Sequence, residues 1–300
     1  MLSTFEIKRE IVQAGSDVEI NLQRTPVGVD KNSLKNLCPG QMTKKGFVYS
    51  WRDATAAAKI NSMNPDWYYT WSLSQIPGVN LPFVPMIWSS KSLAQLPNVK
   101  GDVVLGFNEP DRSDQSNTDV PTAIKYWPQF KATGKRLGSP ATAANPTKGW
   151  QKEFMVSCSD SVDFMCVHWY GSANPHTLLS LLHDLYDLYK KPIWITEFAV
   201  ADWSATTQSK YSESQVIDFM EAVLPALDDL PYVERYCWKT RTTSDVNMGT
   251  SALFNDDGTL TRLGKVYSMH GIMHDDDVPV ARSAALIEEA LNQNNESESD

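Results

Sequence analysis

Two apolar runs of this sequence each end in a glutamate. The first run begins at residue 105 and ends at Glu109, and the second begins at residue 193 and ends at Glu197. An ionised carboxylate at the end of a buried strand is costly unless it is paired, hydrogen-bonded or placed at the mouth of a cleft. Two such residues predict an acid–base pair. Glycosidic bond cleavage uses this chemistry: one carboxyl group protonates the leaving oxygen and the other attacks the sugar or activates water.

The composition narrows the class of ligand. A chain of 300 residues with 42% hydrophobic content can bury the core of one large domain. The formal net charge of −9 argues against nucleic acid and anionic membranes as partners. The 10 Trp and 11 Tyr suit stacking against sugar rings, although core packing accounts for most large aromatic residues. The 4 cysteines form no Cys-x-x-Cys pair, so we expect no metal, and the predicted chemistry needs no cofactor.

Strand-like and helical segments alternate along most of the chain. The expected strands cover residues 45–52, 67–71, 83–89, 103–109, 136–141, 162–170, 192–197 and 233–241. Most of the segments between these strands have helical patterns. One such helix would start at the cap residue Asn174 before Pro175, and another at the capping box of Ser212 and Gln215. Eight strand–helix repeats predict an α/β fold, a (β/α)8 TIM barrel. A doubly wound open sheet is the alternative, but no Gly-x-Gly-x-x-Gly or Walker loop follows any strand.

The barrel would place both glutamates at one face. Glu109 and Glu197 would end the fourth and seventh strands, at the carboxyl face that carries the active site of barrel enzymes. Period-two alternation predicts that Leu105, Phe107 and Glu109 share one side, as do Ile193, Ile195 and Glu197. The same counting brings three further side chains to the two glutamates, and the five together would form a cup: the added residues are His168, Tyr170 and Trp238. Trp169 would point to the side opposite His168.

Five segments carry a resemblance to glycoside hydrolase family 128. They are Lys45-Gly46-Phe47-Val48-Tyr49, Gly106-Phe107-Asn108-Glu109-Pro110-Asp111, Leu137-Gly138-Ser139-Pro140-Ala141, Val167-His168-Trp169-Tyr170-Gly171 and Pro192-Ile193-Trp194-Ile195-Thr196-Glu197-Phe198-Ala199. The likeness covers about residues 44–270. It implies a β-1,3-glucanase or a β-1,3-glucan binder of fungal type.

The resemblance also implies individual roles. Glu109 would be the acid/base, Glu197 the nucleophile of a retaining mechanism, and Asn108 the contact to the sugar 2-hydroxyl and to the nucleophile. Trp88 and Trp238, near strand ends, are candidate sugar platforms. Three further tryptophans are as compatible with core packing as with ligand contact: Trp51, Trp71 and Trp169. His168 is equally compatible with orienting a neighbour and with touching substrate.

Alternatives to an endo-β-1,3-glucanase stay open at this stage. One is a non-catalytic β-glucan-binding cell-wall protein on the same barrel, which would be expected to lack one carboxylate. The other is a retaining glycosidase for a different β-glucan or a mannan, because fold alone does not choose the substrate. We expect a monomer that binds a β-glucan oligo- or polysaccharide, with no nucleic acid and no membrane as partner.

The two ends of the chain have different patterns from the middle. Residues 1–40 contain two alternating runs that predict a β-hairpin extension ahead of the barrel at 41–274. Residues 275–300 form an acidic tail whose composition predicts disorder. The N-terminus shows no signal peptide, which indicates an intracellular protein as encoded, whereas the family resemblance implies an extracellular or cell-wall location.

Overall fold

A computed structural model describes residues 44–271 of the chain. Its strands are β1 (Lys45–Val48), β2 (Trp67–Tyr69), β3 (Val103–Val104), β4 (Arg136–Leu137), β5 (Met165–Gly171), β6 (Ile193–Val200) and β7 (Val233–Trp238). Its α-helices are α1 (Ala56–Ser62), α2 (Val120–Lys131), α3 (Gly149–Cys158), α4 (Pro175–Tyr189), α5 (Glu213–Asp229) and α6 (Arg262–Met269). Short 3-10 helices are η1 (Ser90–Asn98), η2 (Ser159–Ser161) and η3 (Gly249–Ser251).

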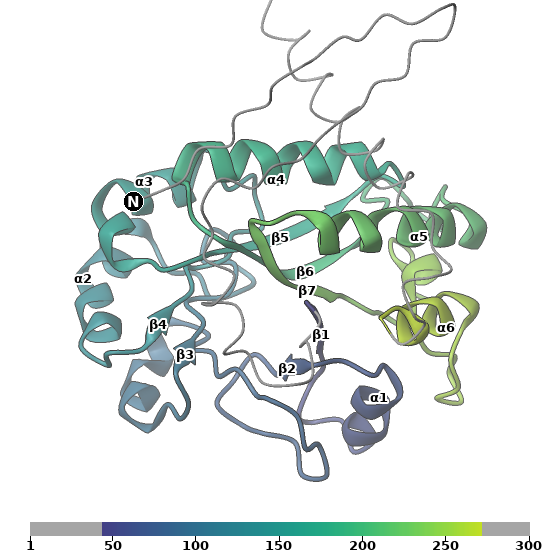
Figure 1. Cartoon of the computed structure of the whole chain (residues 1–300), viewed down its shortest axis with the longest axis horizontal. Coiled ribbons are helices and arrows are strands. Elements are labelled where there is room, and N and C mark those ends of the chain that lie inside the picture. Colours follow the sequence, from purple (N-terminus) through teal and green to yellow (C-terminus); the bar gives the residue numbers. More distant parts are fainter. Residues whose placement is uncertain (1–43, 272–300) are drawn as a thin grey trace, which may run out of the picture. The chain divides into compact units, whose positions relative to one another are not determined.

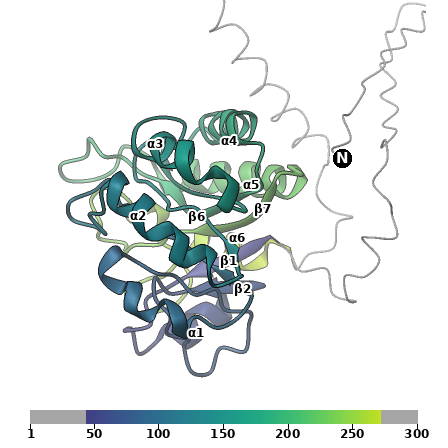
Figure 2. The ribbon, with the colours of Figure 1, turned by 90° about the vertical axis from the view of Figure 1, so that its left-hand side faces the viewer.

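The strands pair in parallel throughout. One sheet has the order β2-β1-β7-β6-β5, and a second contains β3 and β4. The helices surround the strands (Figure 1), and in the turned view α1 lies at the bottom, α2 above it, and α3 and α4 at the top (Figure 2). The prediction of an α/β fold with a parallel sheet is confirmed.

The strand predicted at residues 83–89 is reduced to isolated bridges. Phe83 pairs with Tyr68 of β2, and Met86 pairs with Leu105. Pro82 and Pro85 explain the interruption because proline has no N–H to donate to a ladder. Their carbonyls still accept hydrogen bonds from the backbone of Tyr68 and Leu105, at 3.0 and 2.9 Å. The segment therefore connects β2 to the chain that follows β3 without forming a regular strand.

Helix starts follow the cap residues of the sequence. Asn174 accepts a hydrogen bond from the His176 N–H, and Pro175 occupies the first position of α4. Ser212 and Gln215 form the predicted capping box of α5. Both caps satisfy backbone N–H groups that the first turn of a helix leaves without partners.

Two hydrophobic clusters lie on opposite faces of the strands. The larger packs the strands against the helices and includes Phe47, Ile195 and Trp238. The smaller takes residues from every strand-like segment: Val48, Trp67, Tyr69, Val84, Met86, Leu105, Ala141, Phe164, Cys166, Trp194 and Cys237. Alternate residues of one strand therefore serve different clusters. Trp194 faces the smaller cluster, and both of its neighbours face the larger one.

Two of the three predicted segments fall beyond the described residues. The hairpin expected within residues 1–40 and the acidic tail expected at 275–300 both lie outside residues 44–271. The described chain covers most of the segment expected to form the barrel. Within it, no helix is long and apolar enough to cross a lipid bilayer.

Candidate active site

Glu109 stands where the backbone leaves β3 and turns into a loop. Its N–H donates to the Ala141 carbonyl at 2.7 Å, which ties the turn to the chain after β4. Its φ angle is 40°, in the left-handed region that non-glycine residues rarely adopt. Such a conformation costs on the order of 1–2 kcal/mol, and strain of this kind gathers at functional sites. Gly106 allows the close approach just before it, because a Cβ there would lie 2.8 Å from the Pro140 nitrogen.

An irregularity in β6 determines the direction of the Glu197 side chain. Ile195 pairs with Val167 and Glu197 pairs with His168, so Thr196 is an extra residue without a counterpart in β5. The pairing with β7 has the same surplus, from Ile195 opposite Tyr236 to Phe198 opposite Trp238. A bulge of one residue reverses the side on which later residues stand. Glu197 therefore faces the cleft although Ile195 packs toward the helices, and the predicted shared side for Ile193, Ile195 and Glu197 is wrong.

The same correction applies to the approach to Glu109. Leu105 belongs to the smaller cluster, whereas Phe107 packs against Phe130 of α2 on the helix side. Residues two apart in the sequence thus face opposite directions, and the simple alternation predicted from Leu105 to Glu109 is wrong.

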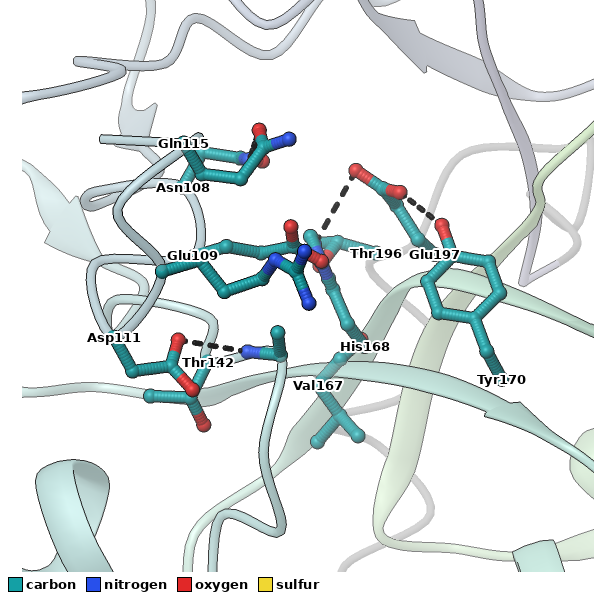
Figure 3. A network of polar contacts seen from close by, with 12 residues as sticks. Asn108, Glu109, Asp111, Gln115, Thr142, Val167, His168, Tyr170, Thr196 and Glu197 are labelled. Carbon is teal, nitrogen blue, oxygen red and sulfur yellow. Dashed lines mark hydrogen bonds and ion pairs between the residues drawn. The ribbon is translucent and has the colours of Figure 1, made fainter. Parts of the chain in front are cut away.

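Hydrogen bonds surround the Glu197 carboxylate. The Trp71 indole N–H donates to Oε1 at 2.7 Å, and the Tyr170 hydroxyl donates to Oε2. Figure 3 shows Glu197 between Tyr170 and His168. Burial alone raises the pKa of Glu197, but His168, Lys239 and these two hydrogen bonds outweigh burial and lower it. The side chain is therefore held as a carboxylate.

His168 joins the two glutamates. Its Nδ1 lies 3.0 Å from Glu109 Oε1, and its Nε2 makes an ion-pair contact of 3.4 Å with Glu197 Oε1 that is too poorly aligned for a hydrogen bond. Burial lowers the pKa of His168, but both carboxylates together raise it. The imidazole is thus placed to hold a positive charge between Glu109 and Glu197. Alternation from Cys166 predicts its direction correctly.

A cleft of about 1010 Å³ opens above these residues. Its lining includes both glutamates, Asn108 and Tyr170, together with four tryptophans: Trp51, Trp71, Trp88 and Trp203. The Asn108 amide nitrogen makes a long 3.4 Å hydrogen bond to Gln115, while its buried Oδ1 has no partner within the described chain. The loop before Gln115 is tied down by Asp111, which accepts from the Ala143 and Ala144 N–H groups at 2.9 Å.

Two tryptophans predicted as ligand contacts lie elsewhere. Trp238 is 0% exposed, donates from Nε1 to the Ser251 carbonyl at 3.0 Å and packs against Phe198. Trp169 stacks on Phe219 of α5 at 5.5 Å between ring centres. Both rings face the helices, so Trp238 is a core residue and its prediction as a sugar platform is wrong. The predicted phase of β7 is one residue out, since Cys237 faces the smaller cluster.

Trp238→Ala should therefore destabilise the fold, by about 3–5 kcal/mol as for a large aromatic removed from a core. Trp203→Ala is the matched control, because that ring is 60% exposed and lines the cleft. It should leave unfolding unchanged and weaken oligosaccharide binding by about 1 kcal/mol. Chemical denaturation and KM measure the two effects. A Trp238→Ala protein of normal stability with a raised KM would restore the platform interpretation.

Lys239 is the cleft residue that sequence reasoning missed. It follows β7 directly, its N–H donates to the Phe198 carbonyl at 2.9 Å, and its side chain lines the cleft. Counting from the buried Cys237 rather than from Trp238 would find it, because alternate residues face the same side. Trp203, in the loop after β6, carries no comparable signal in the sequence.

The side chains at the cleft are suited to proton transfer and to nucleophilic attack. Residues 44–271 contain no group of three or more His, Cys, Asp or Glu side chains suited to hold a metal ion. The cleft lining includes two glutamate carboxylates, a phenol and an ammonium group, and the buried imidazole of His168 contacts both carboxylates. They can exchange protons and carry a nucleophile.

Known proteins resemble this arrangement. The family described as glycosyl hydrolase catalytic core matches residues 46–267. An endo-β-1,3-glucanase of glycoside hydrolase family 128 (subgroup I) from Amycolatopsis mediterranei, solved in complex with laminarihexaose, is 35% identical with a TM-score of 0.67, covering 75% of this chain and 98% of that chain. An oligosaccharide-binding protein of the same family (subgroup VII) from Trichoderma gamsii shares the fold at 23% identity and a TM-score of 0.63, covering 76% of this chain and 93% of that chain.

A curated relative is longer than this chain. Alkali-sensitive linkage protein 1 of Schizosaccharomyces pombe is 34% identical over 215 residues, which are 67% of this chain and 40% of that protein. The chain thus spans less than half the length of this relative.

The chain is a glycoside hydrolase. This follows from its parallel α/β fold, from the two glutamates in one cleft and from its similarity to these relatives. Within that class, the chain belongs to glycoside hydrolase family 128.

Proposed function

We propose that this protein is a retaining endo-β-1,3-glucanase in which Glu197 is the nucleophile and Glu109 the acid/base. The observation that carries the proposal is the different surroundings of the two carboxyl groups on either side of His168. Glu197 accepts hydrogen bonds from Trp71 and Tyr170 and is held ionised, as an attacking group must be. Within the described chain, Glu109 Oε1 is hydrogen-bonded to His168, and the side chain lines the open cleft, where a glycosidic oxygen can reach it.

The reaction proceeds in two displacements. A Glu197 oxygen attacks the anomeric carbon while Glu109 gives its proton to the departing glucosidic oxygen, which forms a covalent glycosyl-enzyme and releases the first product. Glu109, now ionised, then removes a proton from water as the water attacks the same carbon. The bond to Glu197 breaks, and the sugar leaves with its original anomeric configuration.

Substrate class follows from the relatives and the cleft. The Amycolatopsis mediterranei enzyme was solved with laminarihexaose, a β-1,3-linked glucan oligosaccharide. A cleft of about 1010 Å³ lies at the upper end of the range for small-ligand sites, and its tryptophans offer several ring faces. Both features support binding of several consecutive glucose units, and hence cleavage within a chain. An exo-β-1,3-glucanase of the family from Cryptococcus neoformans makes cleavage from chain ends the alternative.

A non-catalytic glucan-binding role is the second candidate function. The similarity of the fold to that of the oligosaccharide-binding protein from Trichoderma gamsii suggests this alternative. The two glutamates and the hydrogen bonds around Glu197 favour catalysis, because binding alone needs no nucleophile held as a carboxylate.

We also infer that the strand segments close into a (β/α)8 barrel. Isolated parallel bridges support closure, since they link β2 through residues 83–86 to Leu105, and Gly138 to Phe164. The smaller hydrophobic cluster supports it too, because it draws on each strand-like segment and packs them against one another.

Hydrolysis of laminarin, compared with carboxymethylcellulose and mannan, tests the proposed function. We expect soluble oligosaccharides of intermediate length from laminarin and at least about 100-fold slower release from the other two polymers, since the wrong linkage misplaces the scissile oxygen. Glucose as the sole early product would indicate exo action. Binding to laminarin without any release of reducing sugar would establish the non-catalytic alternative.

A further inference from the structure

We propose that Lys239 is the positioning residue of the nucleophile: its ammonium group holds the Trp71 indole in the orientation that donates to Glu197, and its charge keeps the Glu197 carboxylate ionised. The inference rests on the proposed role of Glu197 as nucleophile. It adds a residue that neither the sequence motifs nor the relatives assign.

The first observation is the contact between Lys239 and Trp71. Lys239 Nζ lies 3.8 Å from the centre of the Trp71 ring. A cation over an indole face is attracted by the ring quadrupole, most strongly where water is excluded. The Tyr69 ring also packs against the indole in a T-shaped arrangement, with 5.6 Å between the ring centres. Trp71 thus contacts both Lys239 and Tyr69 while its N–H donates to Glu197 Oε1, 2.7 Å away.

The second observation is strain in the Trp71 backbone. Its φ angle is 55°, in the left-handed region where a bulky side chain is an outlier. Such a conformation persists only where surrounding contacts outweigh its cost. Trp71 and Glu109 are the two cleft residues that the described chain holds in this way. The contacts that hold Trp71 include the hydrogen bond to Glu197, the ammonium of Lys239 and the Tyr69 ring.

The third observation is that the Lys239 ammonium group has no acceptor among residues 44–271. It makes no ion pair within 4.0 Å and its ammonium donates to no hydrogen-bond acceptor within the described chain. Its backbone is nevertheless anchored beside the nucleophile, because its N–H donates to the carbonyl of Phe198. Burial and the charge of Arg241 lower the pKa of Lys239, and the attraction of Glu197 and Glu109 offsets this lowering only in part; the ammonium in turn lowers the pKa of Glu197.

Several other groups face Glu197 and set the background for any test. They are His168 and Tyr170 from β5, Tyr69 from β2, Glu109 from the turn after β3, and Cys237 of β7, with Arg241 beside Lys239. His168 stays in place when Lys239 is changed and continues to favour ionisation. The loss of Lys239 should therefore raise the pKa of Glu197 by about one unit rather than restore a neutral carboxyl group.

The test compares Lys239→Met and Lys239→Arg in the full chain. Methionine keeps the apolar stem but removes the charge, so the acid limb of the kcat/KM profile on laminarin should move up by about one pH unit, and kcat at neutral pH should fall by about 10-fold to 100-fold. Arginine keeps the charge and stacks on indole, so its acid limb should match the wild type. Lys125→Met is the control, since Lys125 lies over Tyr126 in α2, outside the cleft residues, and its profile should be unchanged.

A double substitution tests whether Lys239 acts on Glu197 through Trp71. Trp71→Phe keeps a ring under the ammonium but removes the N–H, so Lys239→Met should cost less in the Trp71→Phe background than in the wild type. An equal cost in both backgrounds would overturn positioning through Trp71. The melting temperature of each variant checks that the fold is retained.

A readout without turnover separates this inference from the proposed function. The 13C signal of the labelled Glu197 carboxyl group, assigned by its loss in Glu197→Gln, should titrate about one unit higher in Lys239→Met. An unchanged titration, together with an unchanged acid limb in an active enzyme, would refute the role of Lys239 while the proposed function stands. A shifted titration in a protein that hydrolyses no glucan would support the role and refute the function.

Discussion

Glu197→Gln is expected to abolish hydrolysis of laminarin and of aryl β-glucosides alike. Glutamine keeps the size of the side chain, and its one oxygen can still accept from Trp71 while its amide NH2 replaces the oxygen that faces Tyr170, but a neutral amide cannot form the glycosyl ester. Removal of a nucleophile typically costs about 10⁴-fold or more in kcat, and an activated leaving group does not compensate because the attacking atom itself is lost. Initial rates with both substrate types measure the loss.

Glu234→Gln is the matched control for this substitution. Glu234 is a partly buried glutamate of β7 that pairs with Arg136 at 2.8 Å and accepts from the Trp194 indole, and it does not line the cleft. Its replacement should alter the melting temperature while kcat stays near the wild-type value. Retention of more than a few per cent of activity in Glu197→Gln would exclude Glu197 as the nucleophile.

Glu109→Ala is expected to separate the two steps of the reaction. Laminarin needs a proton on its leaving oxygen, so its turnover should fall by about 10²-fold to 10⁴-fold, the range assigned to general acid–base catalysis. An aryl β-glucoside with a good leaving group needs no such proton, so the first step should stay fast. The glycosyl-enzyme should then accumulate, and release of the aryl group should show a burst followed by a slow steady state.

Azide provides the complementary observation in Glu109→Ala. As an anion, it attacks the glycosyl-enzyme without being deprotonated, so it should accelerate the steady state and give a β-glycosyl azide of retained configuration. Absence of both the burst and the azide effect would refute the assignment of Glu109 as acid/base. Glu153→Ala, a change at an exposed glutamate of α3, should respond to azide no more than the wild type.

Much of the site can be predicted from strand ends and alternation. The sequence predicts that the two glutamates meet in one cleft, and the structure places both in its lining. β5 is regular from Cys166 onward, so the prediction that His168 and Tyr170 point one way and Trp169 the other agrees with the structure. These features depend only on the period of two that an extended backbone imposes.

The departures from that period could not be predicted. The surplus residue Thr196 in β6 and the change of face between Leu105 and Phe107 both reverse the direction of the side chains after them. Nothing in the local residue types marks a bulge, because pairing register is a property of two strands. The glutamates converge, but by way of these irregularities rather than by the uninterrupted alternation expected from the sequence.

The predicted side-chain directions of the eighth strand are wrong by one residue. Tyr236 and Trp238 are the larger aromatic residues of β7, and their size favours placing them toward the cup. They face the helices instead, where packing against Phe198 and Phe219 buries more apolar surface. The small Cys237 faces the crowded smaller cluster with Trp194 and Trp67, and Lys239 then enters the cleft.

Capture of the glycosyl-enzyme tests the central claim most directly. A 2-deoxy-2-fluoro laminaribiosyl fluoride should load the wild-type enzyme, because fluoride leaves readily while the 2-fluoro substituent slows both steps and the second most of all. Digestion and mass spectrometry should find one added disaccharide on the peptide that contains Glu197, and none in Glu197→Gln. A label on Glu109, or an enzyme that releases products of inverted configuration and is never labelled, would contradict the account.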